Sequence, residues 1–236
     1  MSDFAFHPAL DPTALSQAWE PGDRLHIPNI LSQDTADRLA DALGAERDWT
    51  RSVTMRSGSF HVPLVGNEPQ TATHRKWLDD AVVDGGDSEM QYVYDSRPLG
   101  SGGTPLPPRA DILDDFHAWL NEPEQVEMLR AITGSTQVEG VYCQASRFLP
   151  GHVLTRHNDK DAGRRLFAHV FNLTRAWNAD WGGLLVFYDR SGQISRGFVP
   201  VFNSLNLFRT PQNHSVTQVA TFAQGERLAI SGWLMA

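Results

Sequence analysis

The stretch LFAHVFNL, residues 166–173, decides the fold of this chain. It is short, apolar and rich in β-branched and aromatic residues, which favours a β-strand. Four stretches of the same kind follow: GGLLVFY (182–188), GFVPVFNSLNLF (197–208), SVTQVATF (215–222) and RLAISGWLM (227–235). Gly, Asn, Asp and Pro separate them, and no helical period fits between residues 139 and 235. Short strands with such punctuation are typical of an all-β barrel or sandwich.

Two polar motifs flank this array. RHNDKD, residues 156–161, precedes the first strand, and PQNHS, residues 211–215, precedes the fourth. On a strand, residues i and i+2 project from the same face, so His157 and Asp159 can hold one ion together. His214 would complete a set of two histidines and one carboxylate, which leaves coordination positions open and is typical of non-haem Fe(II) oxygenases. In a jelly roll these positions can converge at one open end of the barrel.

The last strand carries an arginine that needs an explanation. Period-two alternation places Arg227, Ala229, Ser231 and Trp233 on one face and Leu228, Ile230 and Leu234 on the other. A cation on such a face is costly to bury unless it meets an anion, and a guanidinium suits a carboxylate. Arg227 and Ser231 therefore form a candidate receptor for the far carboxylate of 2-oxoglutarate. The alternative is a surface arginine on an edge strand, and the metal motif favours the receptor. Trp233 is either a pocket wall or core.

Five segments in order resemble the catalytic core of the prolyl-hydroxylase-like 2-oxoglutarate/Fe(II) oxygenases, in particular the group that acts on a ribosomal-protein proline: RHNDKDAGRRLFAHVFNLT, DWGGLLVFY, VPVFNSLNLF, NHSVTQV and ERLAISGW. The resemblance covers residues 139–235. It implies that His157, Asp159 and His214 bind iron and are catalytic together with Arg227. It further implies that Arg227 and Ser231 hold the co-substrate, and that Leu184 lines its pocket. The implied cofactors are Fe(II), 2-oxoglutarate and O2, with ascorbate as an additional reductant.

The chain departs from the resembled family at two positions. The strand after the H-x-D motif usually carries a tyrosine that touches the co-substrate, and here that position is Asn172. We expect its amide to replace the phenol contact. The strand before the motif often has a tyrosine just before its Pro or Gly, and here Phe148 and Leu149 stand there. We expect cofactor binding to survive both changes and substrate identity to be affected.

Composition narrows the class of protein. The chain has 236 residues and a net charge of −8 with a pI near 5.5, which argues against a nucleic-acid binder. Its acidic surface would instead steer basic protein substrates. The single cysteine, Cys143, excludes an intramolecular disulfide and suits a reducing compartment. No signal peptide or membrane span is recognisable, so we expect a cytoplasmic protein with no membrane partner. The oligomeric state is not determined by the sequence.

The N-terminal half reads as support for this core. We predict a strand over 22–31 and helices over 32–49, 71–83, 109–120 and 122–133. Ser32 and Asn121 are the expected N-caps of the first and last of these helices, and Gly134 is the expected stop signal. The Gly- and Pro-rich segment 84–109, which includes GSGG, is expected to be a mobile loop over the active-site mouth.

The predicted fold is mainly β with flanking helices: a double-stranded β-helix, or jelly roll, with an N-terminal helical annex. We expect one domain over 1–236, in which 1–138 supplies helical support and the mouth loop and 139–236 the catalytic core. His169 is expected to be a packing residue. The leading functional hypothesis is a prolyl hydroxylase of a protein or peptide, with ribosomal or translation-related proteins as candidate substrates. The alternatives are a hydroxylase of a small molecule, such as a free amino acid or a peptide natural product, and a non-catalytic metal-binding jelly roll.

Overall fold

The computed structural model describes residues 3–20, 23–55, 58–69, 71–76, 90–100, 111–161 and 163–236. The N-terminal part contains α1 (Pro12–Gln17), β1 (Arg24–Pro28), α2 (Gln33–Ala45), β2 (Thr50–Met55), β3 (Gly58–Val65), β4 (Glu68–Pro69), β5 (Tyr92–Pro98), α4 (Ile112–Leu120) and α5 (Pro123–Thr133). The C-terminal part contains β6 (Gly140–Phe148), β7 (Val153–His157), β8 (Arg165–Asn172), η2 (Ala179–Trp181), β9 (Leu185–Tyr188), β10 (Ile194–Phe198), β11 (Ser204–Arg209), β12 (His214–Val216) and β13 (Arg227–Met235).

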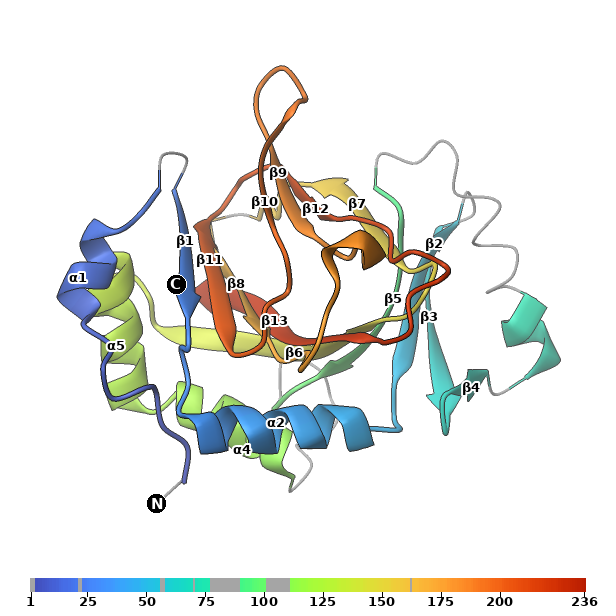
Figure 1. Ribbon diagram of the computed structural model, residues 1–236, viewed down its shortest axis with the longest axis horizontal. Coiled ribbons are helices and arrows are strands. Elements are labelled where there is room, and N and C mark those ends of the chain that lie inside the picture. Colours follow the sequence, from blue (N-terminus) through green and yellow to red (C-terminus); the bar gives the residue numbers. More distant parts are fainter. Residues whose placement is uncertain are drawn as a thin grey trace.

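The strands form one antiparallel sheet that curls over itself. Its order is β1-β11-β8-β13-β6-β5-β7-β12-β9-β10, with β2 joined to β5 and β3 to β2. The larger layer consists of β1, β11, β8, β13, β6 and β5, in that order. Strands β7, β12, β9 and β10 fold back over one of its faces (Figure 1). Strand β5 turns the corner because it pairs with both β6 and β7. This is the jelly roll that the sequence predicted.

The open edges of the curled sheet meet through side chains. The ring of His26 on β1 stacks on Phe198 of β10, with centroids 5.2 Å apart and planes inclined by 16°. Two residues earlier on β1, Arg24 donates to the Ser195 hydroxyl of β10 at 3.2 Å. These contacts close the roll on the side opposite β5, so that a cavity is left between the two layers.

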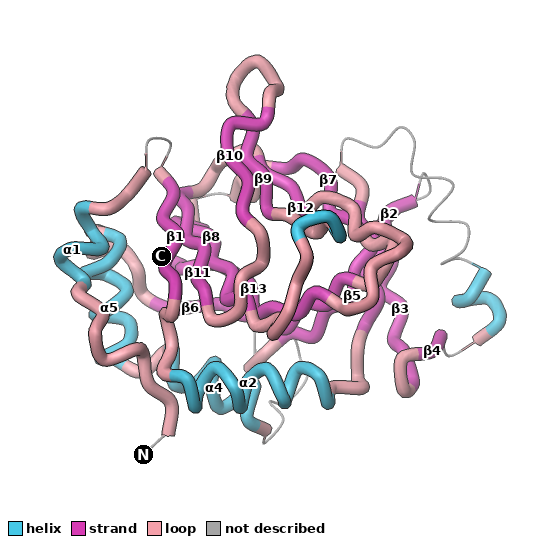
Figure 2. Tube along the Cα trace, in the orientation of Figure 1, coloured by secondary structure: helices cyan, strands magenta, loops and turns pink. Residues whose placement is uncertain are grey.

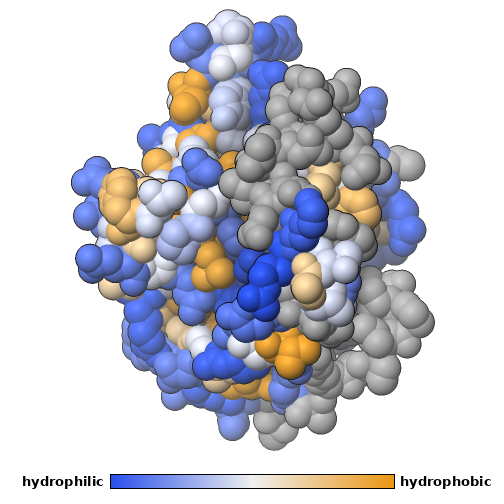
Figure 3. Space-filling view, turned by 90° about the vertical axis from the view of Figure 1, so that its right-hand side faces the viewer, coloured by the Kyte–Doolittle hydropathy of each residue, from blue (hydrophilic) through white to orange (hydrophobic). Residues whose placement is uncertain are grey.

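Helices cover the outer face of the larger layer. In Figures 1 and 2, α2 and α4 run beneath the sheet while α1 and α5 lie beside its β1 end. The main core lies between these helices and the sheet, and it includes Leu39 of α2, Phe116 of α4 and Ile230 of β13. A second, smaller core fills the roll itself around Phe187 and Phe208. On the face shown in Figure 3, hydrophobic residues appear as separate spots among hydrophilic ones.

Four predicted strands are shorter than expected. The predicted strand 22–31 is reduced to β1 and 182–188 is reduced to β9. The stretch 197–208 is divided into the end of β10 and β11, because the chain crosses there from the smaller layer to the larger one. Pro200 offers no amide hydrogen for a ladder, and Asn203 adopts a φ of 56°. The Asn203 side chain then bonds to both the N–H and the C=O of Leu31. The predicted strand 215–222 is reduced to β12, which begins one residue earlier, at His214.

The helices are largely as predicted, with one wrong cap. Ser32 caps α2, its hydroxyl accepting from the Thr35 N–H, and Gly134 ends α5 in the left-handed region with φ 65°. Asn121 does not cap α5; it ends α4, and its side chain bonds both the N–H and the C=O of Val141. The N-cap of α5 is Glu122, which makes no side-chain capping bond. Asn121 was misplaced because β6 competes for its amide.

The expected loop 84–109 is wrong in its centre. Residues 92–98 are strand β5, which pairs with β2, β6 and β7. The other parts of this prediction, residues 84–89 and 101–109 with most of GSGG, lie outside the described residues, as does 77–83 of the helix expected at 71–83; residues 72–76 are helical. The predicted division into a supporting part, 1–138, and a catalytic core, 139–236, stays a prediction. In the sheet, β1 and β5 of the first part pair with strands of the second.

None of the described helices is both long and apolar enough to cross a membrane.

Two buried histidines predict sensitivity of the fold to acid. Burial lowers the pKa of both His152 and His169 from 6.5 to about 4. The folded chain therefore keeps them neutral while the unfolded chain takes up protons below about pH 6.5. Their contribution to stability is complete above that pH and is lost as the pH falls toward 4, by up to on the order of 3 kcal/mol for each. Urea unfolding from pH 7 to 4.5 should show this loss, and His169→Gln should reduce its slope. An unchanged slope in the variant would contradict the assignment.

Candidate active site

Two histidines and an aspartate meet at the mouth of the roll. His157 ends β7 and His214 begins β12, and the two are direct partners across these antiparallel strands. Their ring centroids lie 4.1 Å apart. Asp159, two residues beyond β7, has a φ of 56°, which turns its carboxylate back toward the histidines. Its oxygens lie 3.6 Å from His157 Nε2 and 3.5 Å from His214 Nε2.

The hydrogen bonds of both histidines leave the same ring nitrogen free. His157 Nδ1 bonds to the Thr155 carbonyl at 2.9 Å and His214 Nδ1 to the Gln212 carbonyl at 2.7 Å. Because a carbonyl can only accept, Nδ1 carries a hydrogen in each ring, and Nε2 is the ring nitrogen that faces Asp159 and could bind a metal. Burial, and next the proximity of His157, lower the pKa of His214 to about 4. One ligand atom from each of the three residues lies within 4.8 Å of the others.

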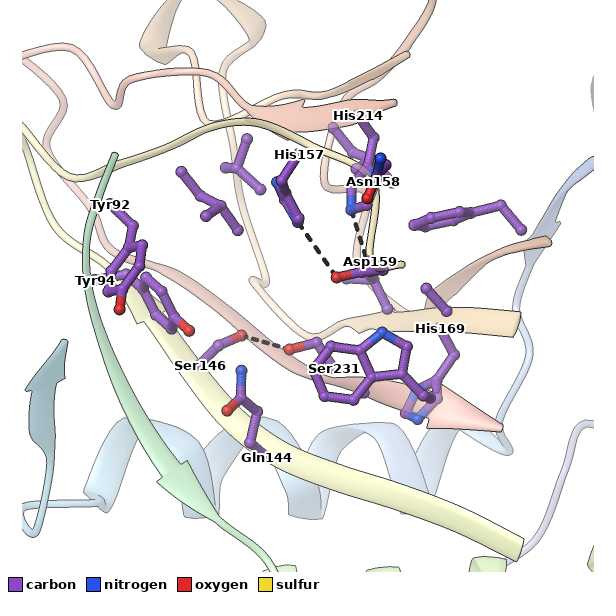
Figure 4. Close-up of a pocket in the computed structure, with 18 of the residues that line it drawn as sticks. Tyr92, Tyr94, Gln144, Ser146, His157, Asn158, Asp159, His169, His214 and Ser231 are labelled. Atoms are coloured by element: carbon purple, nitrogen blue, oxygen red, sulfur yellow. Dashed lines mark hydrogen bonds and ion pairs between the residues drawn. The ribbon is translucent and has the colours of Figure 1, made fainter. Parts of the chain in front are cut away.

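A cavity of about 550 Å³ opens beneath this cluster (Figure 4). Strands β5, β6 and β13 form its floor, and Tyr94, Gln144, Ser146 and Ser231 point into it, as Figure 4 shows. The Ser231 hydroxyl donates to that of Ser146 at 3.4 Å. Trp233, left open between wall and core, does both: it lines the cavity and packs against the smaller core.

Arg227 lies at this floor, only 2% exposed. Burial lowers the pKa of its guanidinium to about 10. Its Nε has no hydrogen-bond partner, and no carboxylate pairs with it among the described residues. The guanidinium lies over the ring of Phe148, whose centroid is 5.2 Å from Cζ. A buried guanidinium without a described counter-charge could pair with an anion that enters the cavity. The period-two alternation predicted for β13 is confirmed.

The structure brings five of the seven predicted site residues to one cavity. His157, Asp159, His214, Arg227 and Ser231 all line it. The other two do not. Leu185 lines the cavity in place of Leu184, and β9 begins at Leu185, three residues after the predicted start of this strand at residue 182. Asn172 is buried against β11, where its amide donates to the Ser204 hydroxyl at 3.1 Å.

Sequence reasoning missed three polar residues of the floor. Gln144 and Ser146 alternate with buried apolar residues along β6, and this period-two pattern was a usable signal. Tyr94 could not be found in this way, because its strand lies in a segment that was read as loop. His169 is buried as predicted: its Nε2 donates to the Tyr142 carbonyl at 3.0 Å and its ring contacts Phe171.

The donor set fits a hard or borderline divalent metal with open positions. Two imidazoles and one carboxylate, each partly shielded from water, are the set that non-haem Fe(II) sites use. The unpaired guanidinium deeper in the same cavity fits a dicarboxylate whose other end reaches the metal ligands. The fit to a metal and the fit to a dicarboxylate are both inferred from the side chains of this chain.

Comparison with known proteins agrees with this arrangement. Residues 143–235 match the family model of the 2OG-Fe(II) oxygenase superfamily. The chain is 31% identical over 129 residues to prolyl 3-hydroxylase OGFOD1 of Mus musculus. That alignment covers 52% of this chain and 22% of the mouse protein, so the chain spans about a fifth of its curated relative.

Solved structures share the fold over nearly the whole chain. A Pseudomonas putida prolyl-4-hydroxylase superposes with a TM-score of 0.60 at 17% identity, covering 95% of this chain and 98% of that one. A Trichoplax adhaerens prolyl hydroxylase, solved with a hypoxia inducible factor peptide fragment, gives 0.60 at 14% identity, covering 95% and 88%. At these identities the likeness concerns the fold, and the predicted jelly roll is confirmed.

Proposed function

We propose that this chain, a prolyl-hydroxylase-like 2-oxoglutarate/Fe(II) oxygenase by its sequence motifs and its fold, hydroxylates a prolyl residue of a protein or peptide. The observation that carries the proposal is the cavity with two histidines and an aspartate at its mouth and, on its floor, a buried arginine that pairs with no described carboxylate. Each feature fits one end of 2-oxoglutarate, and the space between them belongs to one cavity.

In this proposal His157, Asp159 and His214 would hold the metal, and Arg227 with Ser231 would hold the distal carboxylate. Fe(II) bound there with 2-oxoglutarate supplies an O2-dependent oxidation: one oxygen atom enters a substrate C–H bond and the other ends in succinate as CO2 leaves. The protein contributes position and a shielded environment. Thr155 and Gln212 fix the imidazoles through their carbonyls, so the ligand atoms need little reorganisation. Ascorbate is proposed as an additional reductant.

The non-catalytic alternative is disfavoured by Arg227. Burying a guanidinium that has no described partner destabilises the folded chain. A protein that bound only a metal would gain nothing from this arginine that offsets the destabilisation. A co-substrate carboxylate would offset it. The departure at Phe148 lies in the same cavity, whereas Asn172 does not line it, so Phe148 is where this chain would differ from the proteins it resembles.

The substrate proposal has a separate basis. The mouse relative is named as a prolyl 3-hydroxylase, and the Trichoplax structure holds a peptide fragment, which support a protein or peptide substrate here. A ribosomal or translation-related substrate rests on the motif resemblance, and the net charge of −8 would favour basic segments over long distances. A cytoplasmic location is part of the proposal, and the buried free thiol of Cys143 is consistent with it.

Peptides should be oxidised far better than free proline. Proline within a chain has no N–H, so recognition must rest on ring contacts and on the flanking backbone. Free proline offers the ring but no flanking backbone. We expect a proline-peptide library incubated with the enzyme, Fe(II) and 2-oxoglutarate to gain one oxygen atom on proline, as detected by mass spectrometry. The Asp159→Ala variant is the matched control. If free proline or another small amino acid were the far better substrate, the small-molecule alternative would replace the peptide reading.

A further inference from the structure

Three side chains form a row across the floor of the cavity. Phe148 on β6 is the direct partner of Arg227 on β13, and the register of β5 on β6 places Tyr94 opposite Phe148 on the other side. The rings of Tyr94 and Phe148 stack with centroids 5.3 Å apart and planes inclined by 10°. The Arg227 guanidinium carbon lies 5.2 Å from the same Phe148 ring. Tyr94 thus brings a phenol into the row, and only Phe148 lies between it and Arg227.

The Tyr94 hydroxyl is suited to donate into this cavity. In Figure 4 it points from β5 toward Ser146 on the floor, while Tyr92 lies further along the strand. Burial raises the pKa of Tyr94 above its ordinary value, although a hydrogen bond with Gln144 acts in the opposite direction. The phenol therefore stays protonated at neutral pH and remains a hydrogen-bond donor.

The positions where the resembled family carries its tyrosines cannot supply such a donor. Phe148 has the ring without the hydroxyl. The Asn172 amide is turned to Ser204 and does not line the cavity. Among the described lining residues, Tyr92 and Tyr94 are the only phenols, and Tyr94 alone stacks on Phe148 beside Arg227.

A buried charge network holds the row from behind. Asp95, fully buried on the opposite face of β5, accepts from Arg51 at 2.6 Å and from Arg147 at 2.7 Å. Arg147 in turn lies 3.6 Å from Glu226. Asp95, Arg147 and Glu226 are the chain neighbours of Tyr94, Phe148 and Arg227, so these ion pairs fix the three strands at the level of the row. A donor fixed in this way loses little freedom when it binds a ligand.

We propose that Tyr94 donates its phenolic O–H to the distal carboxylate of 2-oxoglutarate that Arg227 pairs with. The contact that family tyrosines make from other strands would be supplied in this chain from β5. The inference rests on the proposed function, because it names a further residue of the same co-substrate pocket. It assigns Tyr94 to binding and orientation of the co-substrate, beyond the stacking that a phenylalanine would also provide.

The test is a binding measurement that needs no turnover. Calorimetric titration of the anaerobic, Mn(II)-loaded protein with 2-oxoglutarate should show that Tyr94→Phe raises Kd about tenfold or more, as expected for a lost hydrogen bond to a charged acceptor. Tyr188→Phe removes a phenol that does not line the cavity; it is the control and should leave Kd unchanged. Binding of 2-oxobutyrate, which has the keto acid but no distal carboxylate, should be equally strong in wild type and Tyr94→Phe.

A relocated hydroxyl gives a second readout. Phe148→Tyr in the Tyr94→Phe background returns a phenol to β6, where the resembled family has it, and should recover affinity for 2-oxoglutarate. An unchanged 2-oxoglutarate Kd in Tyr94→Phe would overturn the inference, and so would an equal loss of affinity for both keto acids. Wild-type protein that bound neither keto acid would instead contradict the proposed function, and the inference with it.

Discussion

Replacing His157 or Asp159 by alanine should abolish stoichiometric Fe(II) binding and 2-oxoglutarate turnover together. The two side chains and His214 bring their ligand atoms within 4.8 Å of one another, and removing any one leaves too few donors to hold the ion. Losing an outer-shell partner alone costs up to about a hundredfold in metal affinity, so a lost ligand should exceed this. Anaerobic titration with Fe(II), followed by metal analysis of the desalted protein, measures the effect.

The control for this prediction is His169, which lines the same cavity but does not belong to the cluster of His157, Asp159 and His214. His169 is buried and its Nε2 is already engaged by the Tyr142 carbonyl, so His169→Gln should keep the metal. The thermal unfolding midpoints of the apo His157→Ala and Asp159→Ala proteins should stay near that of the apo wild type. A normal iron content in either alanine variant would show that the metal is held elsewhere.

Arg227→Met should have opposite effects on binding and on stability. Loss of an ion-paired partner from a sheltered site costs about 2–5 kcal/mol, so the 2-oxoglutarate Kd should rise from about thirtyfold to several thousandfold. The apo protein should lose nothing in stability, because the variant removes a buried guanidinium that has no described counter-charge. Replacing buried charge by an apolar residue is neutral or stabilising, by up to about 4 kcal/mol.

Calorimetry with 2-oxoglutarate and urea unfolding without it measure these two effects on the same preparation. Fe(II) binding should hardly change, which separates this variant from those of the metal ligands. Arg190→Met, an exposed arginine on the β9–β10 hairpin, is the control and should alter neither quantity. A co-substrate dependence that survives Arg227→Met, or an apo protein that is strongly destabilised by it, would remove Arg227 from the pocket.

The C-terminal half was predictable because its signals are local. Alternation along β13 places Arg227 and Ser231 on the cavity side and Ile230 in the helix-facing core, as the pattern indicated. Strand alternation, however, was the wrong reason for expecting His157 and Asp159 to lie close together. Asp159 lies beyond the end of β7, and its left-handed backbone, not strand alternation, brings it to His157.

The features that could not be predicted from the sequence depend on contacts between distant segments. Strand β5 lies among Gly- and Pro-rich residues and is defined by partners more than forty residues away, such as Arg147 for Asp95. Tyr94 therefore stayed hidden. Leu184 was misplaced by a single residue, which in a strand exchanges the two faces. Asn121 satisfies the end of β6 before it can cap α5.

The most direct test of the account follows one oxygen atom. Purified protein is incubated with Fe(II), 2-oxoglutarate and isotopically labelled dioxygen, together with proline-containing peptides from a cell extract that lacks the active protein. Mass spectrometry should find one labelled oxygen on a prolyl residue, matched by an equal amount of succinate and absent with Asp159→Ala. Succinate that forms without any labelled peptide, under conditions where a small amino acid does acquire the label, would contradict prolyl hydroxylation of a protein or peptide.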